Sequence, residues 1–427
     1  MDKLTEFELK EGIKLHCINT ENKFKTNLIS VFLTSDLSKE SITKKALLLS
    51  VLRRGDNVLK SQNEINKKLE DLYGAELDCG VDKNGDNHVS KFYMETLNDK
   101  YTLNTTNVLK ESIDVLFDII LNPIIENGKF KEEYFLGEKE NLKQIIEARK
   151  DNKRAYSTIR CIEEMYKDEP YGLYKYGYIE DLEKITNEDL YKTYNELINN
   201  AKIDIFVSGN IDEEVVKELI SKKIDKLNAR NYKIKKSSNN IELTKTKTII
   251  ERTNVAQGNL NIGMKFNSKS QKDNINAAVY NAVLGGGANS KLFQNVREKA
   301  SLAYSAGSMY IKTKDAMIIK CGIDPENYEK TLDIVKKQLE DMQDGKFTLE
   351  DIEKAVELIV ASYKSMQDEQ DSEITYYFTK ELNQDNMSVN GYIENIKKVS
   401  KEDIIDIAKK IKISTIYFLT KEENANE

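Results

Sequence analysis

The chain has 427 residues and 39% hydrophobic residues, so it is long enough for about two domains with substantial cores. Its net charge is −7, and its lysines are interspersed with acidic residues rather than grouped in a basic stripe, which excludes a nucleic-acid partner. It contains neither a signal-peptide pattern nor an apolar run of about 18 residues, so we expect a cytoplasmic protein with no membrane partner.

Along the chain, strand patterns cluster before helix patterns, once in each half. Runs rich in β-branched and aromatic residues predict strands over 28–33, 88–94, 203–207, 260–266, 316–321 and 413–419. Helical periodicity separates them, and Tyr376, Tyr377 and Phe378 lie in such a pattern, where we interpret them as core residues. This order predicts an α+β fold rather than a doubly wound parallel sheet.

Two segments of the sequence repeat at nearly the same offset. Residues 177–190 match residues 391–404 with seven identities in fourteen positions, and 127–130 resembles 344–347. In the first pair, Thr186 with Asp189 and Ser400 with Asp403 predict capping boxes at the starts of equivalent helices. The sequence therefore predicts two homologous domains that arose by internal duplication.

A polar segment with weak periodicity divides the two halves. It runs over about residues 222–247 and includes Ser237, Ser238, Asn239 and Asn240. We therefore predict an N-terminal domain over residues 1–221, a linker over 222–247 and a C-terminal domain over 248–427.

The most informative motif lies in the second half. Gly285, Gly286 and Gly287 precede a predicted helix that contains Arg297, and Tyr304 follows it. Arginine and tyrosine side chains donate hydrogen bonds, and donors aimed at a polarised carbonyl stabilise an oxyanion. Amide hydrolysis also needs an activated water and a general base, which this segment does not supply. The alternative is that Arg297 is a solvated charge at a helix end and Tyr304 an ordinary strand residue.

In its motifs and duplicated plan the whole chain resembles the insulinase (pitrilysin-like) family of zinc peptidases. The resemblance is carried by a Gly-rich loop followed by Leu292, Phe293, Arg297, Glu298, Lys299, Leu302, Ala303 and Tyr304. It implies two domains, each a mainly antiparallel sheet covered by helices, that face each other around a cleft. In this family an HxxEH motif binds zinc and activates water, and a distal glutamate completes the site.

The chain departs from the family pattern at every position of the zinc site. The resemblance places Ala46 and Ser50 where the two histidines stand, and Leu49 where the catalytic glutamate stands. Ile145 takes the place of the distal ligand, although Glu147 is close by. The only histidines, His16 and His88, are interpreted as ordinary strand or turn residues. We therefore expect no metal or other cofactor on this chain and no peptidase activity when it is isolated.

The resemblance also implies a partner. In two-chain members of this family, one chain carries zinc and the other carries the arginine and tyrosine that hold the scissile carbonyl. Arg297 and Tyr304 would then act in trans on a homologous subunit that carries HxxEH and zinc, with an unfolded peptide as substrate. A homodimer of the isolated chain is the alternative assembly, and the sequence leaves the choice between the two open. The alternative function is a peptide-binding or structural scaffold with no catalytic contribution.

Two interpretations of the glycine triplet stay open. Gly285, Gly286 and Gly287 either reverse the chain before a helix or form a flexible lip that binds the substrate peptide. A phosphate-binding loop is excluded, because neither GxxxxGK[ST] nor GxGxxG after a strand occurs.

Overall fold

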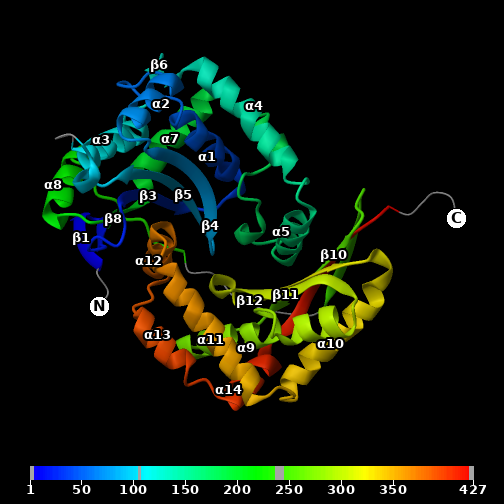
Figure 1. Cartoon of the computed structure of the whole chain (residues 1–427). Coiled ribbons are helices and arrows are strands. Elements are labelled where there is room, and N and C mark those ends of the chain that lie inside the picture. The colour runs from blue at the N-terminus through cyan, green and yellow to red at the C-terminus, as the bar shows by residue number, and fades with distance from the viewer. Residues whose placement is uncertain (1–3, 104–106, 236–244, 423–427) are drawn as a thin grey trace. The chain divides into compact units, whose positions relative to one another are not determined.

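The structure is a computed structural model that describes residues 4–103, 107–235 and 245–422 (Figure 1). The chain forms two compact units. The first unit comprises Met1–Glu147, Leu173–Lys236 and Glu369–Gln384, and the second comprises Ala148–Gly172, Ser237–Asp368 and Asp385–Glu427. Each half of the chain thus contributes a short segment to the unit that is built mainly by the other half. The predicted division at residues 222–247 did not include these two segments.

The first unit is built on a six-stranded sheet. Its strands, in sheet order, are β1 (Leu4–Lys10), β2 (Ile13–Asn19), β8 (Lys202–Gly209), β3 (Thr26–Asp36), β5 (Asn87–Leu97) and β4 (Glu76–Asn84). Neighbours are antiparallel, except that β2 and β8 are parallel. Its helices are α1 (Lys39–Leu52), α2 (Gln62–Asp71), α3 (Val108–Leu121), α4 (Glu132–Ala148), α6 (Ile179–Leu182), α7 (Asn187–Asn200), α8 (Glu213–Lys223) and α12 (Gln370–Asn383).

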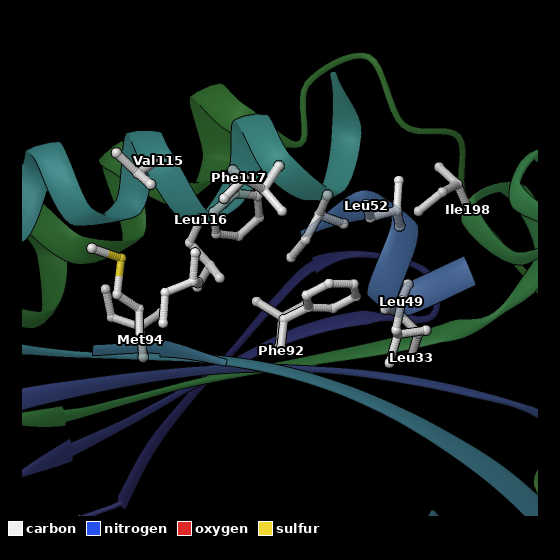
Figure 2. Close-up of a cluster of buried hydrophobic side chains, with 14 of the residues drawn as sticks. Leu33, Leu49, Leu52, Phe92, Met94, Val115, Leu116, Phe117 and Ile198 are labelled. Carbon is white, nitrogen blue, oxygen red and sulfur yellow. The ribbon is translucent and has the colours of Figure 1, made fainter. Parts of the chain in front are cut away.

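The core of this unit lies between the sheet and a helix layer that includes α1, α3 and α7. Alternate residues of each strand face these helices, as in β3, where Ile29, Val31 and Leu33 are buried in the cluster. Figure 2 shows Phe92 and Met94 of β5 on the sheet, with Phe117 of α3 among the helix side chains above them. Burial of such alternate apolar residues is the main free-energy gain that holds helices to a sheet.

The second unit is built on a five-stranded sheet. Its strands, in sheet order, are β11 (Ala303–Ile311), β12 (Ala316–Ile323), β10 (Gly258–Lys265), β13 (Lys412–Thr420) and β9 (Lys247–Arg252). Only β13 and β9 are parallel, so this sheet has the strand order and directions of β4, β5, β3, β8 and β2. Its helices are α5 (Lys153–Met165), α9 (Gln271–Gly285), α10 (Tyr328–Gln343), α11 (Leu349–Met366), α13 (Val389–Ile396) and α14 (Lys401–Lys410).

On its second face, each sheet is packed against a helix that comes from the other half of the chain. In the first unit, α12 packs on β3 and β8 through Ile374, Tyr377 and Phe378, all at most 6% exposed. In the second unit, α5 packs on β10 and β13 through residues that include Cys161 and Met165. The prediction that Tyr377 and Phe378 are core residues is therefore confirmed.

The local predictions from sequence patterns agree well with the structure. Five of the six predicted strands lie within β3, β5, β8, β12 and β13, and the strand predicted over 260–266 coincides with β10 to within two residues at its start and one at its end. Capping boxes are present at Thr186 with Asp189 and at Ser400 with Asp403, as predicted. The sheets are mainly antiparallel and helix-covered, which confirms the mixed α/β architecture.

Part of the predicted linker packs on the first unit. Arg230 is 4% exposed and donates from Nη1 to the carbonyl of Ile198 at 2.9 Å. The hydroxyl of Tyr232 lies 3.0 Å from Oδ1 of Asn87. Residues 236–244 of the predicted linker lie outside the described residues.

None of the helices in the described ranges combines the length and the apolar character that a membrane span requires.

Candidate functional site

Arg297 lies on a short helical segment that is anchored by its apolar residues. The segment, Phe293–Lys299, has π-helical hydrogen bonding, and Val296 within it is fully buried in the core of the second unit. The Arg297 guanidinium lies 4.6 Å from the centre of the Phe293 ring, and Nε is 3.7 Å from Oε1 of Glu298. The Arg297 side chain is 43% exposed, so solvent weakens this ion pair and leaves the guanidinium accessible. Single turns of π-helix are frequent at functional sites.

Tyr304 lies at an irregularity on the edge strand β11. Ala303 pairs with Ile323 and Ser305 pairs with Gly322, so Tyr304 is the extra residue of a β-bulge. The side chain is 68% exposed, and its hydroxyl makes no hydrogen bond to any residue that the structure describes. The amide of Leu302 donates to the carbonyl of Val296 at 3.1 Å, which ties the start of β11 to the segment that bears Arg297. Two exposed hydrogen-bond donors are therefore carried by consecutive, mutually bonded segments of one unit.

Packing explains two of the three glycines. Gly285 is the last residue of α9, and a Cβ there would lie 2.4 Å from Oγ of Ser308 and 2.5 Å from its amide nitrogen. A Cβ on Gly286 would lie 2.7 Å from Cα of Ala282. Gly287 is exposed, and its Cβ would meet only the Leu358 side chain, at 3.3 Å. None of the three has a positive φ, so their backbone conformation does not itself require glycine. Substrate binding by this loop stays a prediction.

Two of the three positions at which the resemblance places the zinc motif belong to the core of the first unit. Ala46 is 5% exposed and Leu49 is 1% exposed, and both lie on α1 in the cluster that Figure 2 illustrates around Leu49. Ser50 is half-buried on the same helix. Methyl and isobutyl side chains offer no lone pair to a metal, so neither Ala46 nor Leu49 can be a zinc ligand. Within the described ranges, no three His, Cys, Asp or Glu side chains are grouped so that they could hold a metal ion.

The inward face of α4 differs from the one that the resemblance implied. Leu142 and Ile146 lie in the same core cluster as Ala46 and Leu49, whereas Ile145 is 44% exposed. The structure therefore does not bring Ile145 together with the residues at the HxxEH positions. A helix places residues three and four apart on one face, so the apolar spacing of α4 could have indicated this from the sequence.

Two ion pairs lie at the C-terminal end of α1, and the sequence patterns did not predict either of them. Nε of Arg54 lies 3.5 Å from Oε1 of Glu138, an 8%-exposed residue on the inward face of α4. Arg53 pairs with Asp78 of β4 through Nη1 and Oδ1. The acidic group that faces α1 is thus neutralised by arginine.

His16 belongs to a buried ionic cluster rather than being an ordinary strand histidine. Its Nδ1 lies 2.9 Å from Oε1 of Glu6, its Nε2 lies 3.3 Å from Oδ1 of Asp204, and its ring stacks on Phe206. Burial lowers the pKa of His16, but hydrogen bonds to Asp204 and Glu6 offset this and raise it above its ordinary value. The other predicted strand histidine, His88, is fully buried on β5, and burial lowers its pKa to about 3.

Comparisons with known proteins confirm the family resemblance that the sequence motifs indicated. A family model described as the peptidase M16 inactive domain matches residues 184–359. The chain is 33% identical over 428 residues to a "Probable inactive metalloprotease YmfF" of Bacillus subtilis, and the match covers the whole of both chains. It is also 28% identical over 215 residues to an "Uncharacterized zinc protease" of Rickettsia felis, over 48% of this chain and 49% of that protein.

Solved structures show the same fold. A conserved protein from Enterococcus faecalis superposes with a TM-score of 0.90 at 29% identity, covering 99% of this chain and all of the other. A protease from Helicobacter pylori superposes with a TM-score of 0.80 at 18% identity, over 98% of this chain and all of its own. The fold and these matches define the class of the protein as an insulinase-like peptidase homologue. The chain belongs to the peptidase M16 family.

Proposed function

We propose that this chain is the noncatalytic, zinc-free subunit of a heterodimeric peptidase, whose partner is a homologous chain that carries HxxEH and zinc. The observation that carries the proposal is the contrast between the two units. Arg297 and Tyr304 remain solvent-accessible on the second unit, while Ala46 and Leu49 are buried in the first. The matching strand order and strand directions of the two sheets support an origin of the two units by duplication.

In this proposal, the two exposed donors act on the partner's substrate. The guanidinium of Arg297 and the phenol of Tyr304 donate hydrogen bonds to the scissile carbonyl oxygen as negative charge develops on it. The substrate is an unfolded peptide, held by backbone pairing along an edge strand, which gives weak sequence specificity. Donors act through space, so they contribute from a second chain when closure brings them within about 3 Å of the oxygen.

A scaffold role is the second candidate, and one observation favours it. Arg297 already lies against Phe293 and Glu298 of its own segment, as an ordinary surface arginine does. In a scaffold, the subunit stabilises the complex or holds the peptide without contacting the reacting carbonyl.

The experiment that separates the two candidates uses the reconstituted complex with the HxxEH subunit. Arg297→Ala and Tyr304→Phe should each lower kcat for peptide cleavage by roughly a hundredfold, because one oxyanion donor is lost. Assembly, followed by analytical ultracentrifugation, should be unchanged. Lys299→Ala is the matched control, since this lysine is an exposed cation on the same helical segment. Unchanged kcat in both variants would leave only the scaffold role.

A further inference from the structure

Three backbone irregularities follow one another in the second unit, between Phe293 and Tyr304. The first is the π-helical segment Phe293–Lys299, the second is the positive φ of 52° at Ser301, and the third is the β-bulge at Tyr304. Arg297 lies in the first and Tyr304 forms the third, so Ser301 lies between the two proposed donors. Backbone conformations of these kinds are often found at functional sites.

Ser301 is the residue at which the chain leaves the π-helical segment. The residue before it, Ala300, has a φ of −87° and a ψ of −17°, which are still right-handed. Ser301 is left-handed, and the amide of the following Leu302 donates to the carbonyl of Val296 at 3.1 Å. A left-handed residue followed by an amide that bonds back into the last turn is a common helix ending. Glycine usually occupies the left-handed position, because it has no Cβ to clash with the backbone.

The surroundings of Ser301 impose this conformation, which a serine side chain disfavours. Ser301 is exposed, and its hydroxyl makes no hydrogen bond to any residue that the structure describes. The chain is anchored on both sides of it, since Val296 is fully buried and Ala303, the first residue of β11, is 9% exposed. The left-handed turn is therefore the connection that lets both anchors reach the core.

The π-helical segment is also fixed from α10. Asn295 donates from Nδ2 to Oε1 of Gln338 at 2.8 Å, and Gln338 is 6% exposed. Oδ1 of Asn295 accepts a hydrogen bond from Nζ of Lys299 at 3.2 Å. Rotation of the segment would break the bond to the buried Gln338, which is costly to lose. The segment that carries Arg297 is therefore held in place, and the turn at Ser301 determines how the chain continues towards Tyr304.

We propose that Ser301 is a positioning residue, whose left-handed turn sets the distance and direction between the Arg297 guanidinium and the Tyr304 phenol. Both groups must reach one carbonyl oxygen, and a misplacement of about 1 Å at a reacting centre is enough to cost much of the rate. This inference rests on the proposed function, because the spacing matters only if both donors act on the same substrate.

The test compares three variants in the reconstituted complex with the HxxEH subunit. Ser301→Val should lower kcat about tenfold and leave KM nearly unchanged, because a β-branched residue disfavours the left-handed conformation and shifts the turn. Ser301→Gly should keep the wild-type kcat, because glycine adopts this conformation freely. Ala300→Val is the matched control, since it places the same side chain on the adjacent residue, whose φ is −87°. It should also keep the wild-type kcat.

A double-mutant cycle separates positioning from a general loss of structure. In a background that carries Arg297→Ala and Tyr304→Phe, Ser301→Val should not lower kcat further, because the turn has no donors left to position. An equal fall in both backgrounds would overturn the inference, and so would a Ser301→Gly variant as slow as Ser301→Val. Sedimentation and circular dichroism check assembly and folding. If Ser301→Val does not assemble, Ser301→Thr takes its place, since threonine is β-branched and retains the hydroxyl.

The outcomes also distinguish this inference from the proposed function. If Arg297→Ala and Tyr304→Phe lower kcat but Ser301→Val does not, only the positioning role is wrong. If Arg297→Ala and Tyr304→Phe leave kcat unchanged, the proposed function is wrong, and the positioning role fails with it.

Discussion

The ring of Phe378 stacks on the ring of Phe32, with centroids 3.9 Å apart and an interplanar angle of 11°. Phe32 lies on β3, near the start of the chain, and Phe378 lies on α12, in the last fifth. Edge contacts with Phe206 of β8 complete the group at 5.7 and 6.4 Å. These contacts show that the first unit is completed by a helix from the far half of the sequence, and that a cut at the linker would separate parts of one core.

The first prediction concerns this dependence on α12. A fragment of residues 1–236 should expose the apolar surface around Phe32, bind the dye ANS and aggregate, because it lacks the α12 side chains that pack on that face of the sheet. A synthetic peptide of residues 369–384 should restore a soluble complex, measured by light scattering. The same peptide with Phe378→Asp should fail. A fragment that stays monomeric and dye-free without the peptide would contradict the prediction.

The second prediction concerns pH and the ionic cluster that joins α12 to the sheet. Glu381 of α12 lies 2.8 Å from Nζ of Lys14 and 3.1 Å from Nζ of Lys202, and Lys202 also pairs with Asp204, which His16 contacts. The pKa of His16 is raised in the folded state above its ordinary value of 6.5. Protonated His16 therefore stabilises the fold fully below pH 6.5, and this stabilisation is lost as pH rises through the higher folded-state pKa.

Burial raises the pKa of Asp204 and Glu381, but their cationic partners offset this and hold both below their ordinary values. The pKa of Glu6 is also lowered, first by its hydrogen bond to His16. The stability that these carboxylates contribute is present above their unfolded values and is lost as pH falls through the folded ones. Thermal unfolding between pH 5.5 and 9 should therefore show a decline on the alkaline side in the wild type that is absent in His16→Gln. Parallel curves for the two proteins would refute this.

The third prediction concerns the positions at which the family resemblance places the zinc motif. The triple variant Ala46→His, Leu49→Glu, Ser50→His should not bind stoichiometric zinc. The inward face of α4 presents Leu142 and Ile146, and its carboxylate there, Glu138, is already paired with Arg54. Placing a carboxylate at the buried position 49 should lower the free energy of unfolding by several kcal/mol. Metal analysis and urea denaturation measure the two effects. Ser50→His alone is the control, and it should be tolerated because Ser50 is only half-buried. Tight zinc binding by the triple variant would show that the region still forms a metal site.

The fourth prediction separates packing from substrate binding in the glycine loop. Gly285→Ala should destabilise the second unit by about 1–3 kcal/mol, because its Cβ would overlap the backbone and hydroxyl of Ser308. Gly287→Ala should leave the melting temperature nearly unchanged, since its Cβ meets only a flexible leucine side chain. If the loop binds substrate, Gly287→Ala should still raise KM in the reconstituted complex. Equal melting temperatures for the two variants would show that the close packing at Gly285 is not maintained in solution.

Residues close together in the chain were enough to predict the local elements, and the motifs were enough to predict the family. Alternating apolar residues located the strands such as 28–33, and hydroxyl-acid pairs such as Thr186 with Asp189 located helix starts, because strand alternation and capping depend on residues close in the chain. The motif around Arg297 and Tyr304 identified the family, and the sequence at Ala46, Leu49 and Ser50 already excluded the usual zinc ligands.

Contacts between residues far apart in the chain are known only from the folded structure. It assigned α5 and α12 to sheets in the opposite halves, paired Arg54 with Glu138, and placed His16 between Glu6 and Asp204. A sequence pattern shows that a helix has an apolar face but not which of two similar apolar sheets it covers, since both offer comparable burial. That choice depends on the summed packing and ion pairing of residues distant in sequence, which exists only once the chain has folded.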